Sequence, residues 1–436
     1  MIESILFKDV EIMTSSERKQ GDVYVLHGQI VAIQPSLSVD AALVINNKGL
    51  TLMPGVIDPH VHFREPGITH KESIYSGSKA AVRGGVTSFF EMPNTRPATI
   101  DEATLSEKKS IASQTSLANY NFFIGATNSN LDILNRVKNI PGIKVFVGSS
   151  TGNMLVDDQD ILEEMFRNGS RLIAVHSEDE STIRQNNGLF LGSTDVHDHP
   201  KIRDVSAAVK STKRLISLSK KYKRRLHICH LTTGEEATLL AASHADYITT
   251  EVTPQHLLLW GPSCYDQLGT LAQINPPIRE KKQADMLWNH LLKGTIQCIG
   301  TDHAPHTLEE KMMPFGTAPS GMPGVETSLP LFLTLAYQGK CTYQNVITWL
   351  CESPAAIYGI QNKGQLIEGY DADLTLVDLK KTHTLSNKNV ISKCGWTAFD
   401  GWQCTGDVIA TFVNGQPVYR EGDFFETVKG KEVQMS

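Results

Sequence analysis

The sequence lacks the features by which a membrane or secreted chain is recognised. No stretch approaches the roughly 18 consecutive apolar residues that a membrane-spanning helix requires. Residues 1–19 carry acidic side chains among their apolar ones and do not contain the apolar core of a signal peptide. The net charge is only −6 over 436 residues, so neither a nucleic acid nor a membrane surface is indicated as a partner.

The seven cysteines lack a regular pattern as well. Their number is odd, and none of them stands at the spacing of a zinc finger. This usage is typical of a reducing compartment rather than of a disulfide framework. Hydrophobic residues make up 40% of the chain and charged residues 20%, as in an ordinary globular protein. We therefore expect a soluble, cytoplasmic protein.

Through the middle of the chain, apolar segments typical of strands alternate with segments typical of helices. The strand candidates are residues 52–62, 86–94, 120–127, 143–148, 171–177, 225–232, 246–253 and 296–305. Eight buried strands with helices between them predict an α/β fold of the (β/α)₈ TIM-barrel type. We place this barrel at residues 54–363.

The two ends of the chain have a different pattern. Residues 1–53 and 364–436 contain short alternating runs with turn residues, and NGQPVYREG is typical of a hairpin. Neither end is long enough to form a substantial sheet core alone. We therefore expect both ends to combine into one small β-sandwich domain beside the barrel.

Two histidines stand one residue apart in PGVIDPHVHFREPG, residues 54–67. Successive side chains of a strand alternate between its faces, so His60 and His62 project in the same direction. Arg64 continues this parity if the backbone stays extended. Two imidazoles on one side can bind a metal ion, and an arginine beside them can bind an anion.

Active-site residues of barrel enzymes come from the carboxyl ends of the strands. The chemistry-bearing residues at those ends are His60, His62, Lys144, His176, His230 and Asp302. Each has a simpler interpretation, because a lone histidine is more often a hydrogen-bonded rim residue. Lys144 could pair with Glu178, and Asp302 could cap a helix. Together, four histidines, a lysine and an aspartate are a coherent donor set for two zinc ions.

The lysine has a particular use in such a set. A neutral lysine amine reacts with carbon dioxide to give a carbamate, whose two oxygens can bridge two cations. Two such ions, about 3.5–4 Å apart, share a water and ionise it near neutral pH. Asp302 is then placed to accept the proton of the hydroxide and to return it to a leaving nitrogen.

Several motifs carry a resemblance to a known family. DPHVHFREPG, KAAVRGGVTSFFEMPNTRPA, HICHLTT, INPPIR, GTDHAPH and GYDADLTLVD resemble the amidohydrolase superfamily, and within it the dihydroorotases. The resemblance covers nearly the whole chain in order, including both ends. HxH alone marks only a metal-dependent hydrolase, whereas HFREPG together with MPNT is much narrower.

The resemblance implies a centre of two Zn²⁺ ions per chain, bridged by a carboxylated Lys144 and a hydroxide. His60, His62 and Asp302 match the residues on the more buried ion, and His176 and His230 match those on the second. Some dihydroorotases have an aspartate in a DDG stretch where this chain has KVFVGSSTGNM. This departure places the chain among the lysine-bridged members. His227 competes with His230 for its position, although strand parity turns His227 the other way.

The resemblance also implies substrate contacts. Arg64 and Asn94 match positions that bind the ring carboxylate in dihydroorotases, His306 assists them, and Asn275 matches a ring-contacting position. A surface salt bridge and a turn asparagine are the simpler interpretations of Arg64 and Asn94. His197 and His199 have metal-like spacing but lie in a loop with proline, so we interpret them as loop residues. The Gly- and Pro-rich residues 306–327 either shape the substrate mouth or only connect two elements.

By this resemblance the chain interconverts N-carbamoyl-L-aspartate and L-dihydroorotate in pyrimidine biosynthesis. The first rival is another cyclic amidase, such as an allantoinase, dihydropyrimidinase or hydantoinase. The substrates of those enzymes lack the ring carboxylate, so those enzymes have less need for Arg64 together with Asn94. A non-catalytic scaffold is a further possibility, but every ligand position is filled. A small-molecule substrate is expected for every one of these enzymes, and a homodimer or homotetramer would be usual for the superfamily.

Overall fold

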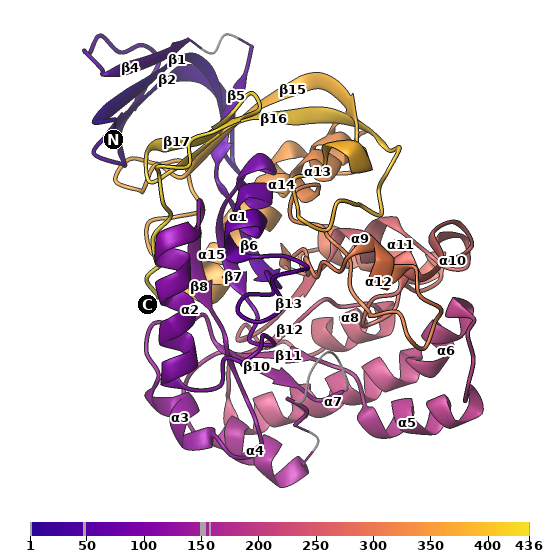
Figure 1. Ribbon diagram of the computed structural model, residues 1–436. Helices are drawn as coiled ribbons and strands as arrows, with labels where there is room; N and C mark the ends of the chain where they lie inside the picture. The colour runs from indigo at the N-terminus through magenta and orange to yellow at the C-terminus, as the bar shows by residue number, and fades with distance from the viewer. Residues whose placement is uncertain (1, 47–48, 149–153, 157, 436) are drawn as a thin grey trace.

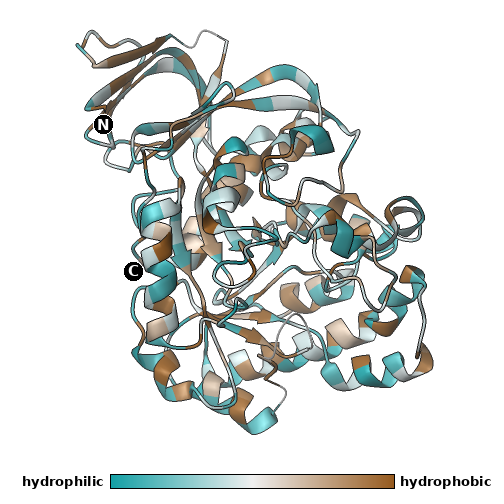
Figure 2. Cartoon of the chain, in the orientation of Figure 1, coloured by the Kyte–Doolittle hydropathy of each residue, from teal (hydrophilic) through white to brown (hydrophobic). Residues whose placement is uncertain are grey.

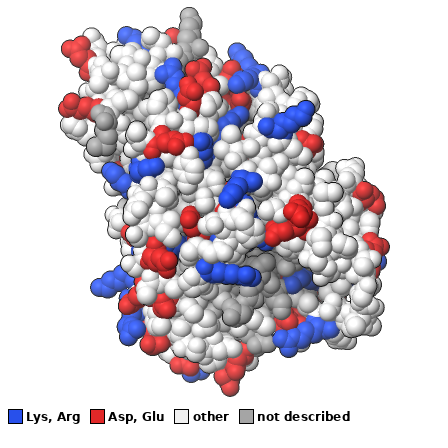
Figure 3. Space-filling view, in the orientation of Figure 1, with Lys and Arg blue, Asp and Glu red and all other residues white. Residues whose placement is uncertain are grey.

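The computed structural model places a parallel barrel beside a curled sheet that contains both ends of the chain (Figure 1). It describes residues 2–46, 49–148, 154–156 and 158–435. No helix in these ranges is long and apolar enough to cross a membrane. The face shown in Figure 3 has basic and acidic side chains interspersed over both parts, in keeping with the small net charge.

The barrel has the predicted parallel topology. Its strands are β6 (Val56–Val61), β7 (Val86–Glu91), β8 (Asn119–Phe122), β9 (Ile124–Gly125), β10 (Ile143–Phe146), β11 (Ile173–His176), β12 (Leu226–Ile228), β13 (Ile248–Val252) and β14 (Cys298–Ile299). Neighbouring strands pair in chain order from β6 to β8 and from β9 to β14. The backbone of His62, just after β6, donates to the carbonyl of His303 beyond β14 at 2.7 Å. This contact closes the ring, and the TIM-barrel prediction is confirmed.

Two of the predicted strands are interrupted. The run at 52–62 divides at Gly55, where the backbone changes partners: Gly55 donates to Asp373 in the terminal sheet and Val56 to Gly85 in the barrel. Thus β5 (Thr51–Pro54) belongs to one part and β6 to the other. The run at 120–127 divides because Phe123 donates back to β7 while Ala126 donates forward to β10.

Helices cover the outside of the barrel and bear the signals expected at their ends. The longer ones are α1 (Ile74–Arg83), α2 (Glu102–Thr115), α4 (Gln159–Arg167), α5 (Glu180–Leu189), α7 (Val205–Tyr222), α8 (Gly234–Ala241), α11 (Lys281–Leu292) and α13 (Ser328–Tyr337). Shorter ones are α3 (Leu131–Arg136), α6 (His199–Ile202), α9 (Pro254–Leu258), α10 (Ser263–Leu268), α12 (Leu308–Lys311), α14 (Tyr343–Ile347) and α15 (Ser353–Tyr358). Ser73 and Asp101 form capping boxes at the starts of α1 and α2. Hydrophobic and hydrophilic residues lie side by side along these helices in Figure 2, because one face packs on the strands and the other meets water.

Strands from both chain ends form one sheet, in the order β18-β17-β16-β15-β5-β1-β2-β3, with β4 on β1. Their bounds are β1 (Ser4–Met13), β2 (Arg18–Leu26), β3 (Gln29–Gln34), β4 (Leu43–Asn46), β15 (Leu374–Thr384), β16 (Gln403–Val413), β17 (Gln416–Arg420) and β18 (Asp423–Phe424). The rings of Phe7 in β1 and Phe412 in β16 meet at 4.9 Å although two strands separate them in the sheet. The two layers of the expected sandwich are therefore halves of one curled sheet (Figure 1).

Two parts of the C-terminal range leave this sheet for the barrel. Between β15 and β16, residues 385–402 extend to the loop after β14, where Trp396 donates from its indole Nε1 to the carbonyl of His306 at 2.8 Å. Near the end of the chain, Val433 donates to Tyr120, and Tyr120 donates to Lys431 along β8. The segment 364–436 therefore contacts the barrel at two places outside the sheet.

Candidate active site

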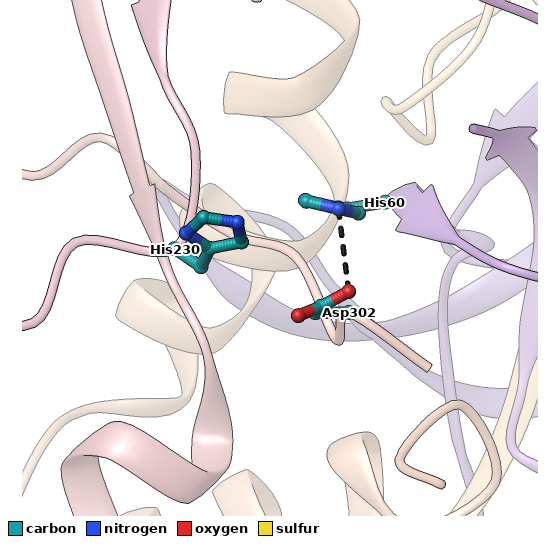
Figure 4. A group of neighbouring side chains, drawn as sticks. All are labelled: His60, His230 and Asp302. Carbon is teal, nitrogen blue, oxygen red and sulfur yellow. Dashed lines mark ion pairs between the residues drawn. The ribbon is translucent and has the colours of Figure 1, made fainter. Parts of the chain in front are cut away.

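The metal-ligand candidates gather at the carboxyl ends of the barrel strands. His60 Nε2 lies 3.3 Å from Asp302 Oδ1, and His62 Nε2 lies 3.0 Å from the same oxygen. Figure 4 shows His60, His230 and Asp302 converging from three strand ends. One donor atom of each of these three lies within 4.8 Å of the others, which is a suitable spacing for one shared cation. The parity expected for HVH is the geometry found.

The outer nitrogens of the HVH pair are held by other side chains. Nδ1 of His60 contacts the buried carboxylate of Glu251, and Nδ1 of His62 lies 2.7 Å from Oδ1 of Asn94. Both partners accept hydrogen bonds, so each histidine carries a proton on Nδ1 and directs Nε2 toward Asp302. A metal-binding histidine needs this arrangement, with one ring nitrogen donating to a partner and the other facing the ion.

In the second pair of histidines, only His176 is oriented in the opposite sense. Nδ1 of His176 lies 3.1 Å from Nε2 of His230, and Nε2 of His176 lies 2.9 Å from Glu178. Glu178 is itself paired with Arg203. His176 therefore presents Nδ1 to the site, and His230 presents Nε2. Nδ1 of His230 is buried without a hydrogen-bond partner among the described residues.

Lys144 is completely buried in β10. Its Nζ lies 3.1 Å from Sγ of Cys229, and its charge lowers the pKa of both His176 and His230 after the larger effect of burial. It forms no ion pair with any carboxylate of the described chain. The pairing with Glu178 is not formed: Oε2 of that carboxylate binds Arg203 and His176, and Oε1 has no hydrogen-bond partner among the described residues.

The fold places His227, His197 and His199 outside the group of metal-ligand candidates. It also excludes a helix-capping role for Asp302. His227 contacts Thr249 and Glu251 and lies in a separate group of possible donors, with Glu251 and Cys298, rather than with His60, His230 and Asp302. The helix N-cap nearest to Asp302 along the chain is Thr307, at the start of α12. His197 and His199 lie in a short 3₁₀ helix and in α6. They bind Asp266 and the backbone of Ile274, away from the metal-ligand candidates.

Burial and charge set the protonation states of this group. Burial lowers the pKa of His62 to about 3 and that of His230 well below its ordinary value, so both rings are neutral. For His60 burial acts in the same direction, but the Glu251 carboxylate outweighs it and raises the pKa to about 10. Burial raises the pKa of Asp302, and the surrounding histidines reverse this and hold it below its usual range. The neutral rings of His62 and His230 beside an ionised aspartate fit a divalent cation, and His60 must release its extra proton when a cation binds.

The substrate-side candidates lie around a cavity of about 770 Å³ that is lined by Arg64, Asn94 and His306. The Arg64 side chain is buried, its Nε donates to the carbonyl of Pro305 at 3.0 Å, and Nη2 lies 3.1 Å from Nε2 of His306. Arg64 has no ion pair with a carboxylate in the described ranges. Asn94 offers its oxygen to His62 and also lines the cavity.

The loop at 306–327 completes this side of the site, whereas Asn275 is not among the described residues that line the cavity. Oδ1 of Asn275 is buried without a hydrogen-bond partner among the described residues. Gly321 has φ of +142°, and a Cβ there would lie 3.0 Å from the His306 ring and 2.5 Å from the carbonyl of Ala304. Only glycine allows this close approach. Since His306, Glu310 and Pro319 line the cavity, the loop shapes its wall as well as connecting two elements.

Four residues that support the site are not evident from the sequence. Glu251 and Glu178 hold His60 and His176, while Lys71 and Lys311 support the substrate side. Lys71 contacts His306 at 2.8 Å, and the buried Lys311 donates to the carbonyls of Gln273 and Pro319. A carboxylate in the apolar strand ITTEV is the one signal that marks Glu251 in advance.

Comparison with known proteins defines the class. A sequence model of the Amidohydrolase family matches residues 51–418. The chain therefore belongs to the amidohydrolase family.

Individual relatives narrow this class further. A dihydroorotase from Pyrococcus furiosus is 35% identical over 89% of this chain and 86% of its own length. A dihydroorotase from Methanothermobacter thermautotrophicus is 34% identical over 92% and 91%. Among solved structures, an L-hydantoinase (dihydropyrimidinase) from Arthrobacter aurescens has a TM-score of 0.94 at 27% identity and covers 100% of both chains. A dihydropyrimidinase from Brevibacillus agri has a TM-score of 0.93 at 26% identity over 99% of both. The protein is accordingly a hydrolase that acts on small cyclic amides.

Proposed function

We propose that this amidohydrolase is a dihydroorotase, which interconverts L-dihydroorotate and N-carbamoyl-L-aspartate in pyrimidine biosynthesis. The observation that carries the proposal is the buried Arg64 at the cavity wall, without a carboxylate partner among the described residues. An unpaired buried guanidinium is costly unless a ligand supplies the anion. Dihydroorotate has a ring carboxylate that fits this requirement, and relatives at 34–35% identity bear the same name.

We further propose that two Zn²⁺ ions are held by six residues: His60, His62, Lys144, His176, His230 and Asp302. Lys144 would bridge them as a carbamate, which is consistent with its burial and its lack of an ion pair in the described structure. The ions would ionise a shared water and polarise the amide carbonyl. The donor set of imidazoles and a carboxylate suits zinc.

The side chains of the protein would supply the remaining steps. Arg64, Asn94 and His306 hold the carboxylate, and Asn275 contacts the ring. Asp302 accepts the proton of the attacking water and passes it to the ring nitrogen as the amide bond breaks. In the direction of ring closure the same aspartate removes the proton from the ureido nitrogen. Its lowered pKa keeps it ionised in the resting protein.

Another cyclic amidase is the second candidate. The solved structures with TM-scores of 0.93 and 0.94 are a dihydropyrimidinase and an L-hydantoinase, so the same fold and site accommodate rings without a carboxylate. The presence of Arg64 inside the cavity favours dihydroorotase over this candidate. A non-catalytic scaffold has no support, because each expected ligand position carries a suitable donor.

The test is turnover of the zinc-loaded protein on L-dihydroorotate, dihydrouracil and allantoin side by side. We expect preference for L-dihydroorotate, and a loss of at least about 100-fold in kcat/KM for that substrate in Arg64→Ala. Arg18→Ala is the matched control, since Arg18 pairs with Glu11 on the surface of the terminal sheet. Preference for dihydrouracil or allantoin would refute the dihydroorotase assignment and leave the cyclic amidase.

Domain limits, assembly and location stay as proposals. We propose a sandwich of residues 1–53 and 364–436 and a barrel of 54–363, in a cytoplasmic dimer or tetramer. All seven cysteines are free and buried, in keeping with a reducing compartment. Light scattering after size-exclusion chromatography measures the oligomeric state. Limited proteolysis near the boundaries between the two parts tests whether each part stays folded on its own.

A further inference from the structure

Two loops from distant parts of the chain meet in the wall of the cavity. Lys71, between β6 and α1, places its Nζ 2.8 Å from Nδ1 of His306, beyond β14. The same Nζ lies 3.1 Å from Oε1 of Glu310 at α12. The side chain of Lys71 is only 13% exposed and that of His306 is 4% exposed, so bulk water does not replace this contact.

The surroundings of His306 determine which ring nitrogen carries the proton. Burial, Arg64 and Lys71 hold the pKa of His306 far below its ordinary value, so the ring is neutral and has a single N–H. Nε2 lies 3.1 Å from the carbonyl of Ser320, which can only accept a hydrogen bond. Nδ1 faces the ammonium of Lys71, which can only donate. Both contacts are satisfied in one tautomer, with the proton on Nε2.

This tautomer leaves Arg64 without an acceptor on the ring. Nη2 of Arg64 lies 3.1 Å from Nε2 of His306, but both atoms then carry hydrogens. Arg64 lines the cavity and its Nε already donates to Pro305, so the terminal N–H groups of the guanidinium are the ones left for a ligand there. A planar guanidinium with two such groups matches a carboxylate in a bidentate pair.

We propose that Lys71 is a positioning residue for the substrate carboxylate. By donating to Nδ1 it keeps the proton of His306 on Nε2, which prevents the ring from accepting a hydrogen bond from Arg64. The guanidinium thus stays available to the ligand. Without Lys71 the proton can move to Nδ1, and Nε2 then competes with the substrate for Arg64. This inference rests on the proposed function, because it takes the ring carboxylate of dihydroorotate as the ligand.

A direct ionic contact between Lys71 and the substrate is the competing interpretation. The ammonium already lies against the Glu310 carboxylate, which offsets its charge. We therefore favour an effect of Lys71 on the tautomer of His306 over a direct contact between Lys71 and the substrate.

The experiment compares the zinc-loaded wild type with Lys71→Met and with Lys79→Met. Lys79 is the matched control because it is a lysine on α1 that pairs with Glu426 on the outer surface. The ¹⁵N chemical shifts of histidine rings, with His306 assigned through His306→Gln, report which nitrogen is protonated. Steady-state kinetics on L-dihydroorotate and on dihydrouracil report whether the carboxylate is involved.

We expect the Nε2–H tautomer in the wild type and a mixture in Lys71→Met. In this variant KM for L-dihydroorotate should rise by about 10- to 100-fold with little change in kcat, and dihydrouracil turnover should not respond. An Nδ1–H tautomer in the wild type would overturn the proposal, and this measurement needs no variant. A raised KM with an unchanged tautomer would also overturn it in favour of direct contact. A wild type inactive on dihydroorotate would refute the proposed function, while the tautomer still decides whether Lys71 acts on His306.

Discussion

Glu251 contacts His60 on the side of the ring that faces away from Asp302: its carboxylate contacts Nδ1, and Nε2 of the same ring faces Asp302. The other carboxylate oxygen of Glu251 lies 3.2 Å from Nε2 of His227. One buried side chain from β13 therefore orients a metal-ligand candidate from β6 and a structural histidine from β12.

Replacing Glu251 by Gln should weaken zinc binding by about 10- to 100-fold. A glutamine has only one accepting oxygen, so its amide nitrogen must face one of the two histidines. Competition with a chelator measures the affinity, and Glu163→Gln at the surface of α4 is the control. Equal affinity in wild type and Glu251→Gln would show that His60 keeps its orientation without the carboxylate.

Lys144 should be carboxylated in the zinc-loaded protein. We expect a ¹³C carbamate signal after incubation with labelled bicarbonate, and its loss in Lys144→Arg together with at least one of the two ions. The reason is that a guanidinium cannot form the carbamate that supplies the bridging oxygens. Metal content is measured after dialysis, with Lys79→Arg as the control. Two tightly bound ions without a carbamate signal would contradict this expectation.

Two substitutions of Asn94 should separate its contact with His62 from its contact with the substrate. Asn94→Asp keeps an acceptor for Nδ1 of His62 but adds a negative charge beside Arg64. We expect zinc content near that of the wild type and KM for L-dihydroorotate raised by about 10-fold or more. Asn94→Leu removes the acceptor and should lose metal as well. If both variants keep the wild-type KM, Asn94 has no part in binding the carboxylate.

The buried ion pair of Lys108 and Glu91, at 2.8 Å with both side chains fully buried, should matter for stability. Lys108→Met leaves the carboxylate of Glu91 unpaired, and we expect a loss of about 3–5 kcal/mol in the free energy of unfolding. Adding Glu91→Leu removes the stranded charge and should recover most of this loss. Urea unfolding of the two variants measures both effects. A double variant no more stable than Lys108→Met would mean that the hydrogen bond from Lys108 to Met92 carries the stability instead.

Lys311 should make stability depend on pH. Burial, aided by Arg64 and Lys71, lowers its pKa from 10.5 to about 7. Between pH 7 and 10.5 the unfolded chain therefore binds more protons at this residue than the folded one, and the free energy of unfolding rises with pH. The slope is up to about 1.4 kcal/mol per pH unit.

This slope is measured as the difference between wild type and Lys311→Met in urea unfolding at several pH values. We expect the free energy of unfolding of the wild type to increase relative to that of the variant as the pH rises from 7 to 9.5. Lys281→Met, at an exposed lysine, should give a constant difference over the same range. A constant difference for Lys311→Met too would show that the amine stays charged in the folded protein.

Much of the barrel and of the metal-ligand set follows from local patterns. Period-two alternation puts His60 and His62 on one side, and the location of Lys144, His176 and Asp302 at strand ends brings them together once the strands are parallel. What local patterns cannot show is where a continuous apolar run changes sheets. The break at Gly55 depends on backbone partners at Gly85 and Asp373, which lie far away in the sequence.

The supporting residues are missed for a related reason. Glu251 reaches His60 only because β13 and β6 lie near each other in the closed barrel, and barrel closure is a property of the whole chain. Lys71 and His306 are 235 positions apart and both lie in loops, where no periodicity predicts which side chains meet. The resemblance to dihydroorotases indicates the substrate-side candidates, but it does not indicate Lys71 beside them.

The segment 385–402 makes the terminal sheet part of the active-site structure rather than a separate module. Trp396 binds the backbone of His306, and Ser392 binds Glu72, whose carboxylate lies 3.5 Å from His303. An exchange of C-terminal ranges between two family members would therefore carry along the groups that support the substrate loops. Relatives that diverge in substrate should be poor donors of this range to one another, even where their sheets superpose.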